Sequence, residues 1–124
     1  MSESESRRER GQRLFREVTT GEPVEPADAY MQFTMDAVFG DVWSRPGLTR
    51  KERRWITLTC VGISGAPGAM KYHIEAALRS GDIAPDEMIE WCVHFAHYAG
   101  WPLSSSVYTE VRSAIAGLEA STQT

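Results

Sequence analysis

The sequence is poor in cysteine and contains no long apolar run. Two cysteines, Cys60 and Cys92, are too few for a disulfide framework or a four-cysteine zinc site. No apolar stretch reaches the ~18 residues that span a bilayer. The segment Met1–Ser6 lacks the apolar core of a secretory signal peptide. We therefore expect a cytoplasmic protein that does not associate with membranes and whose two thiols are reduced and buried.

An excess of basic residues is also missing. Lys and Arg number 13 against 17 Asp and Glu, which gives a net charge of −4 and argues against a nucleic-acid-binding protein. Leu, Ile, Val and Phe together number only 24 of 124 residues. A small domain with so thin an aliphatic core often buries further surface against a partner. The composition therefore favours self-association.

Proline and glycine divide the chain into segments with helical periodicity. The pattern predicts a weakly anchored N-terminal helix within residues 1–20, followed by a single helical domain over 21–124. Within that domain we expect helices over about 26–40, 49–63, 67–80, 85–100 and 102–118, with a loop over 41–48. No segment alternates as a strand would. The predicted fold class is all-α, a compact antiparallel bundle of about six helices with short loops.

The third predicted helix combines a cationic start with a long apolar body. Beyond its first turn it is apolar almost all round, so we expect it to be central and buried. Its first turn carries the cationic run Arg50, Lys51, Arg53 and Arg54. We interpret this run as a solvated face, with a subunit contact as the next possibility.

Histidines are the first candidates for chemistry. Trp91 and Tyr98 lie on the same helix side as His94, at i−3 and i+4, and His73 lies on the preceding helix. An imidazole in such a pocket suits proton transfer near neutral pH; the alternative is an inert polar residue at a helix edge. His97 lies three residues from His94 and points toward another face. The motifs Glu-x-x-His and His-Glu-x-x-His are missing, so we expect no metal.

The loop over 41–48 is the second candidate. It holds a carboxylate, an indole and a guanidinium within five residues, namely Asp41, Trp43 and Arg45. Arg45 has the geometry for a two-pronged contact with a substrate carboxylate. The alternative is structural: Asp41 caps an element, Trp43 packs, and Arg45 pairs with an acid.

Four stretches, taken in order, resemble the carboxymuconolactone decarboxylase family of the alkylhydroperoxidase D-like superfamily. They are Gly40–Leu48, the apolar helix that follows it, His73–Gly81 and Tyr98–Pro102. The resemblance covers about residues 30–118. It implies an all-helical subunit that forms a homo-oligomer, either a trimer or a hexameric ring built as a trimer of dimers.

The resemblance also implies a cofactor-free decarboxylase that acts on a small carboxylated lactone or cyclic acid in aromatic-compound breakdown. His73 or His94 would be the general acid, Arg45 would orient the substrate, and Trp43, Tyr98 and Asp41 would line the pocket. Family decarboxylases usually carry an acid four or five residues before His73, where this chain has Ala69 and Gly68.

Two alternatives remain open at the level of sequence. One is a non-catalytic oligomeric member that binds a small ligand, which Gly68 and Ala69 favour. The other is a thiol-dependent peroxidase, whose Cys-x-x-Cys motif would precede His73. Ala66 and Ala69 occupy those positions, which disfavours peroxidase chemistry.

Overall fold

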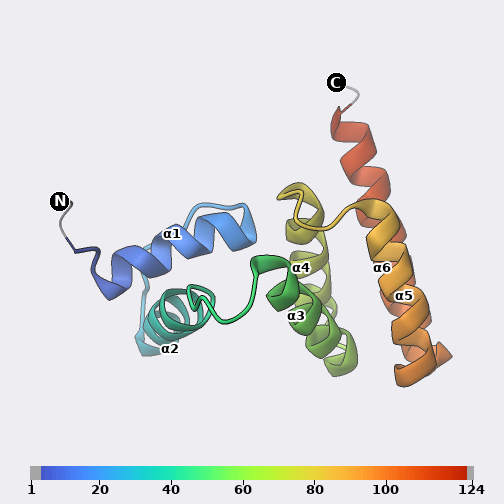
Figure 1. The fold of residues 1–124 in the computed structure, drawn as a ribbon, viewed down its shortest axis with the longest axis horizontal. Helices are drawn as coiled ribbons and strands as arrows, with labels where there is room; N and C mark the ends of the chain where they lie inside the picture. The colour runs from blue at the N-terminus through green and yellow to red at the C-terminus, as the bar shows by residue number, and fades with distance from the viewer. Residues whose placement is uncertain (1–3, 123–124) are drawn as a thin grey trace. The chain divides into compact units, whose positions relative to one another are not determined.

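The structure, a computed structural model, describes residues 4–122, and every regular element among them is a helix (Figure 1). Residues 1–3, the start of the polar N-terminal segment, and 123–124 lie outside the described residues. The elements are α1 (Arg7–Thr19), α2 (Ala29–Phe33), the π-helix η1 (Thr34–Val42), α3 (Arg50–Ser64), α4 (Pro67–Arg79), α5 (Pro85–Ala99) and α6 (Trp101–Thr122). The predicted all-α class is confirmed. None of these helices is both long and apolar enough to cross a membrane.

Two compact units make up the chain, Met1–Arg50 and Lys51–Thr124. The boundary that the sequence predicts, after residue 20, lies inside the first unit. The loop residues Trp43 and Arg45 therefore belong to the first unit, and the three histidines belong to the second.

In the first unit, α1 packs directly on η1. The helix begins at a capping box, because the Ser6 hydroxyl accepts the Glu9 N–H and the Glu9 carboxylate accepts the Ser6 N–H. Leu14 and Val18 are buried in one cluster with Phe39 and Trp43. At Gly11 a Cβ atom would lie 2.2 Å from the Met35 carbonyl oxygen, so only glycine permits this crossing.

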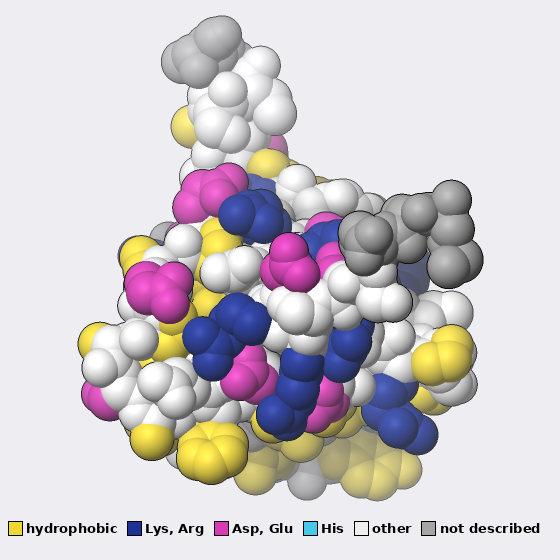
Figure 2. All heavy atoms as spheres, turned by 90° about the vertical axis from the view of Figure 1, so that its left-hand side faces the viewer, with side chains coloured by type: hydrophobic (Ala, Val, Ile, Leu, Met, Phe, Trp, Pro, Cys, Tyr) yellow, Lys and Arg dark blue, Asp and Glu magenta, His cyan; other side chains and the backbone are white. Residues whose placement is uncertain are grey.

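Ion pairs surround this packed core. Arg7 and Arg10 both donate to the Asp41 carboxylate, at 2.6 and 3.1 Å. Arg8 donates to Asp36, at 2.9 Å for the Nη2–Oδ2 contact. Figure 2 shows basic and acidic side chains interleaved on this side of the protein. These pairs account for the arginine-rich start of the chain.

The region predicted as one helix over 26–40 is only partly α-helical. Asp28 caps α2 by accepting the Met31 N–H at 3.0 Å, and after five residues the helix widens into η1. At its end the Trp43 N–H donates to the carbonyl of Val38, five residues back. The predicted loop start at Asp41 is wrong, since Asp41 and Val42 still belong to this π-helix.

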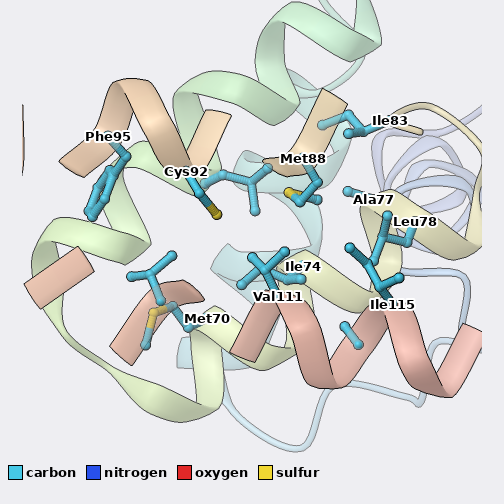
Figure 3. Packing of buried hydrophobic residues seen from close by; sticks show 13 residues of the cluster. Met70, Ile74, Ala77, Leu78, Ile83, Met88, Cys92, Phe95, Val111 and Ile115 are labelled. Carbon is cyan, nitrogen blue, oxygen red and sulfur yellow. The ribbon is translucent and has the colours of Figure 1, made fainter. Parts of the chain in front are cut away.

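The core of the second unit is formed by α3, α4, α5 and α6 (Figure 3). Its central residues include Ile74 from α4, Met88 and Cys92 from α5, and Val111 from α6, all buried. Gly100 alone separates α5 from α6 and has φ 96°. Such a backbone conformation strains any residue with a side chain, which explains glycine at this reversal.

The prediction that α3 is central and buried is wrong. Only Arg54, Leu58 and Gly62 of this helix are buried, whereas Ile56 and Ile63 are each 54% exposed. Cys60 is exposed as well, so the prediction of a buried thiol holds for Cys92 alone. The helix thus contributes one narrow stripe to the core and leaves apolar side chains uncovered.

The cationic run is a solvated face only in part. Arg54 is only 2% exposed, and its guanidinium donates to Asp82 Oδ2 at 2.8 Å and to Ser80 Oγ at 3.2 Å. Lys51 pairs with Glu87, and Arg50 pairs with Glu17. The solvated-face interpretation is therefore wrong for Arg54, which ties α3 to the turn between α4 and α5.

Candidate functional site

His94 lies on an exposed face of α5, with its ring stacked on Tyr98 one turn later. The ring centroids are 5.2 Å apart and the planes differ by 16°. This is the i, i+4 pairing that the sequence predicts. Among the described residues 4–122, no hydrogen bond holds the His94 ring. Both ring nitrogens are therefore available to a ligand.

A groove of about 380 Å³ runs between α3 and α5 beside this stack. Its lining comprises Thr59, Ile63, Trp91, His94, Phe95, Tyr98 and Ala99. Trp91 Nε1 donates to Thr59 Oγ1 at 3.1 Å, which fixes the indole against α3. The two helices approach closely at Gly62, where a Cβ would lie 2.9 Å from the Phe95 ring. The groove is thus mostly apolar and aromatic, with one imidazole.

A second groove, of about 320 Å³, continues from the first and shares Trp91 and His94 with it. Trp55, Glu87 and Glu90 complete its lining. Glu87 already pairs with Lys51 and accepts the Ala84 N–H at 2.9 Å. His94 therefore stands between an apolar wall on one side and a carboxylate-bearing wall on the other.

His73 occupies a different setting, on α4. Its half-buried ring meets Tyr72 edge-on at 5.7 Å, and it is not among the residues that line either α3–α5 groove. Burial lowers the pKa of His73, and the positive charge of Arg54 lowers it further. At neutral pH this imidazole is therefore neutral, which suits a proton acceptor better than a proton donor.

We expect the His73 ring to titrate below the ordinary imidazole pKa of about 6.5. Since the unfolded chain then binds the proton more readily than the folded one, folding stability should fall as the pH drops below that value. NMR titration of the His73 ring protons measures the midpoint directly, and His73→Asn should remove the corresponding slope in stability. A midpoint at or above 6.5 would contradict the burial argument.

His97 is engaged locally. Its Nδ1 lies 2.7 Å from the Val93 carbonyl oxygen, and its ring meets Trp101 edge-on at 5.5 Å. In the described chain, no group of three His, Cys, Asp or Glu side chains could hold a metal ion.

The three loop candidates lie in the first unit, in different environments. Asp41 is held by Arg7 and Arg10, and the Arg7 guanidinium keeps the pKa of that carboxyl below its usual range. Trp43 is buried in the α1–η1 cluster. Arg45 is exposed and lines a pocket of about 220 Å³. Two further arginines, Arg13 and Arg50, line the same pocket, and both are paired with the Glu17 carboxylate.

Sequence reasoning missed the α3 side of the groove. Thr59 and Ile63 lie on a different helix from His94, about thirty residues earlier, and no local spacing connects them. The exposed apolar residues of α3 were the available signal, because a helix that is apolar all round has more apolar surface than one core can cover.

Two comparisons with known proteins point to the same protein family. The model of the carboxymuconolactone decarboxylase family matches residues 28–112. A protein named 4-carboxymuconolactone decarboxylase, from Acinetobacter baylyi (strain ATCC 33305 / BD413 / ADP1), is 32% identical over 77 residues. That match covers 62% of this chain and 57% of the relative, so the chain spans little more than half the length of the relative it matches.

Proposed function

Because the chain belongs to the carboxymuconolactone decarboxylase family, we propose that it is a cofactor-independent carboxy-lyase. Its substrate is a small carboxylated lactone or cyclic acid from aromatic-compound breakdown. The name of the Acinetobacter relative supports this reaction class. His94 is the proposed general acid, and its position in the α3–α5 groove is the single observation that carries the proposal.

The groove has the properties that this reaction needs. When the carbon–carboxylate bond breaks, carbon dioxide leaves and the electron pair is delocalised over the unsaturated lactone as a dienolate. A proton must then be returned to a carbon atom of the dienolate. His94 donates it from Nε2 or Nδ1, and water then reprotonates the imidazole. The aromatic walls formed by Trp91, Phe95 and Tyr98 favour the loss of a charged carboxylate as a neutral gas.

His94 is preferred over His73 for this role on two grounds. Its ring has no hydrogen-bond partner in the described chain and lines both grooves. Burial and the charge of Arg54 lower the pKa of His73, which disfavours the protonated form that an acid needs. His73 stays the alternative candidate for the acid.

Arg45 is the proposed ligand of a substrate carboxylate. The support is its exposed position in the lining of a polar pocket of the first unit. Asp41 and Trp43 contribute to this pocket in different ways. Asp41 anchors η1 to α1 through Arg7, and Trp43 forms one wall of the pocket.

A homo-oligomer, either a trimer or a hexamer built as a trimer of dimers, is the proposed assembly. The support lies in large apolar side chains that the single chain leaves exposed outside these grooves, among them Phe33 of α2 and Ile56 of α3. The cytoplasmic location expected from the sequence stays a prediction.

The test is carbon dioxide release from 4-carboxymuconolactone by the purified protein, followed between about pH 5 and 8. An acid–base imidazole makes the rate vary with pH in that range. Absence of release from the folded protein, with this lactone and with related cyclic acids, would sink the carboxy-lyase proposal.

The second candidate is a non-catalytic member of the family that binds a small ligand. It is favoured by Gly68 and Ala69 at positions where family decarboxylases usually carry an acid. It is also favoured by the lining of the two α3–α5 grooves, which includes no Lys or Arg. Saturable binding of a lactone without turnover at any pH would support this candidate. A thiol peroxidase stays the third alternative, disfavoured by the missing Cys-x-x-Cys.

A further inference from the structure

A separate pocket lies between α5 and α6. Its α5 wall consists of Ile89, Cys92, Val93 and Ala96. At about 100° per residue these side chains lie on the opposite side of the helix from Trp91, His94, Phe95 and Tyr98. The pocket is therefore distinct from the groove in which the proposed reaction takes place.

The pocket is almost entirely apolar. Its α6 wall consists of Trp101, Ser104, Ser105 and Tyr108, and no charged side chain is among its lining residues. Burial raises the pKa of the Cys92 thiol to about 11, so at neutral pH this group too is uncharged. An ionised ligand would lose its hydration here without gaining a counter-charge, and an uncharged one would not.

One polar group in this wall is unused. Ser104 is only 7% exposed, and its hydroxyl has no hydrogen-bond partner in the chain between residues 4 and 122. Neighbouring hydroxyls of α6 behave differently, since Ser105 donates to the Pro102 carbonyl at 3.3 Å and Thr109 to the Ser105 carbonyl at 3.0 Å. The Ser104 side chain lines the pocket, so a ligand seated there can supply the partner that the chain does not.

The size of the pocket limits the ligand. Its volume is about 270 Å³. An apolar cavity of about 150 Å³ holds benzene, so this one has room for a single ring with a short substituent. The indole of Trp101 and the phenol ring of Tyr108 provide faces on which a flat ring can pack.

We propose that the α5–α6 pocket is a second binding site for an uncharged single-ring molecule that carries one hydroxyl or carbonyl group. The ring lies between α5 and the two α6 aromatics, and its polar group bonds to Ser104 Oγ. This site goes beyond the proposed decarboxylase reaction and does not depend on His94.

Phenol, toluene and benzoate are suitable probes because they share one ring and differ in a single group. Calorimetric titration of the full-length protein at pH 7 should show saturable binding of phenol, weaker binding of toluene and none of benzoate at this pocket. Backbone amide shifts should map phenol to residues of α5 and α6 that line it. Absence of saturable phenol binding overturns the proposal. This includes the case in which a second copy of the chain covers the pocket.

Three variants test the hydroxyl contact and the location of the bound ring. Ser104→Ala should weaken phenol binding by about two- to tenfold, the effect of one neutral hydrogen bond, and leave toluene unchanged. Ser106→Ala, on the exposed part of the same turn, should change neither. Val93→Trp, at the half-exposed rim, should abolish binding of both by filling the pocket.

Two outcomes of the variants contradict the proposal. Equal weakening of phenol and toluene by Ser104→Ala would remove the role of the hydroxyl. Unchanged phenol binding in Val93→Trp would place the ligand elsewhere. His94→Gln should retain phenol binding in full, so a failure of the decarboxylase proposal and a failure of this one give different results.

Discussion

Replacing His94 by glutamine should lower kcat for decarboxylation by about 10²–10⁴-fold, the usual effect of removing a general acid. Glutamine keeps hydrogen-bonding capacity and much of the volume but cannot donate a proton to carbon. Substrate binding should change little, because the walls formed by Trp91 and Phe95 remain. The loss should therefore fall on kcat rather than on KM. Rates of carbon dioxide release under saturating and limiting substrate measure the two separately.

His97→Gln is the matched control, since it makes the same chemical change on the same helix. The His97 ring is bonded to the Val93 carbonyl and lies outside the α3–α5 grooves, so turnover should be close to that of the wild type. His73→Gln forms the third arm. If it were His73→Gln that abolished turnover while His94→Gln left it intact, the assignment of the acid would be wrong.

Replacing Asp82 by asparagine should destabilise the protein by about 3 kcal/mol. Asp82 accepts from Arg54 at 2.8 Å, and that guanidinium is only 2% exposed. Asparagine preserves the shape but removes the negative charge that compensates a buried positive one. The cost is large because the arginine stays charged at any pH at which the protein folds.

Urea unfolding followed by circular dichroism measures this effect. With a dependence of about 1–3 kcal/mol per molar urea, the midpoint should fall by about 1–3 M. Glu119→Gln removes a negative charge from an exposed position on α6 and should leave the midpoint within a few tenths of a molar. A midpoint for Asp82→Asn equal to that of the control would show that the buried pair contributes nothing net.

Local patterns in the sequence were sufficient for α4 and α5. Proline at the start of α4 and α5, and glycine after α5, predict boundaries that the structure reproduces to within one or two residues. The widening of the chain into η1 was not predictable in this way. A π-helix differs from an α-helix only in its hydrogen-bond partners, and the apolar spacing of Met35 and Phe39 fits both.

Long-range partners account for the wrong predictions. The carboxylate that Arg54 binds, Asp82, lies 28 residues away, and no local spacing in the sequence links the two. The helix-by-helix pattern placed Tyr98 beside His94 correctly but gave no indication of the α3 residues that form the opposite wall. Burial of α3 was overestimated because an apolar residue predicts a contact without saying whether this chain or another one provides it.

The packing of α1 on η1 has a consequence for the response of the first unit to ionic strength. Its exposed ion pairs, such as Arg7 with Asp41, weaken as salt is added, because the screening length falls to about 3 Å in 1 M salt. The backbone contact at Gly11 and the burial of Leu14 and Val18 carry no charge and are not screened. The arginine-rich helix is therefore held mainly by forces that salt leaves intact, despite its highly charged sequence.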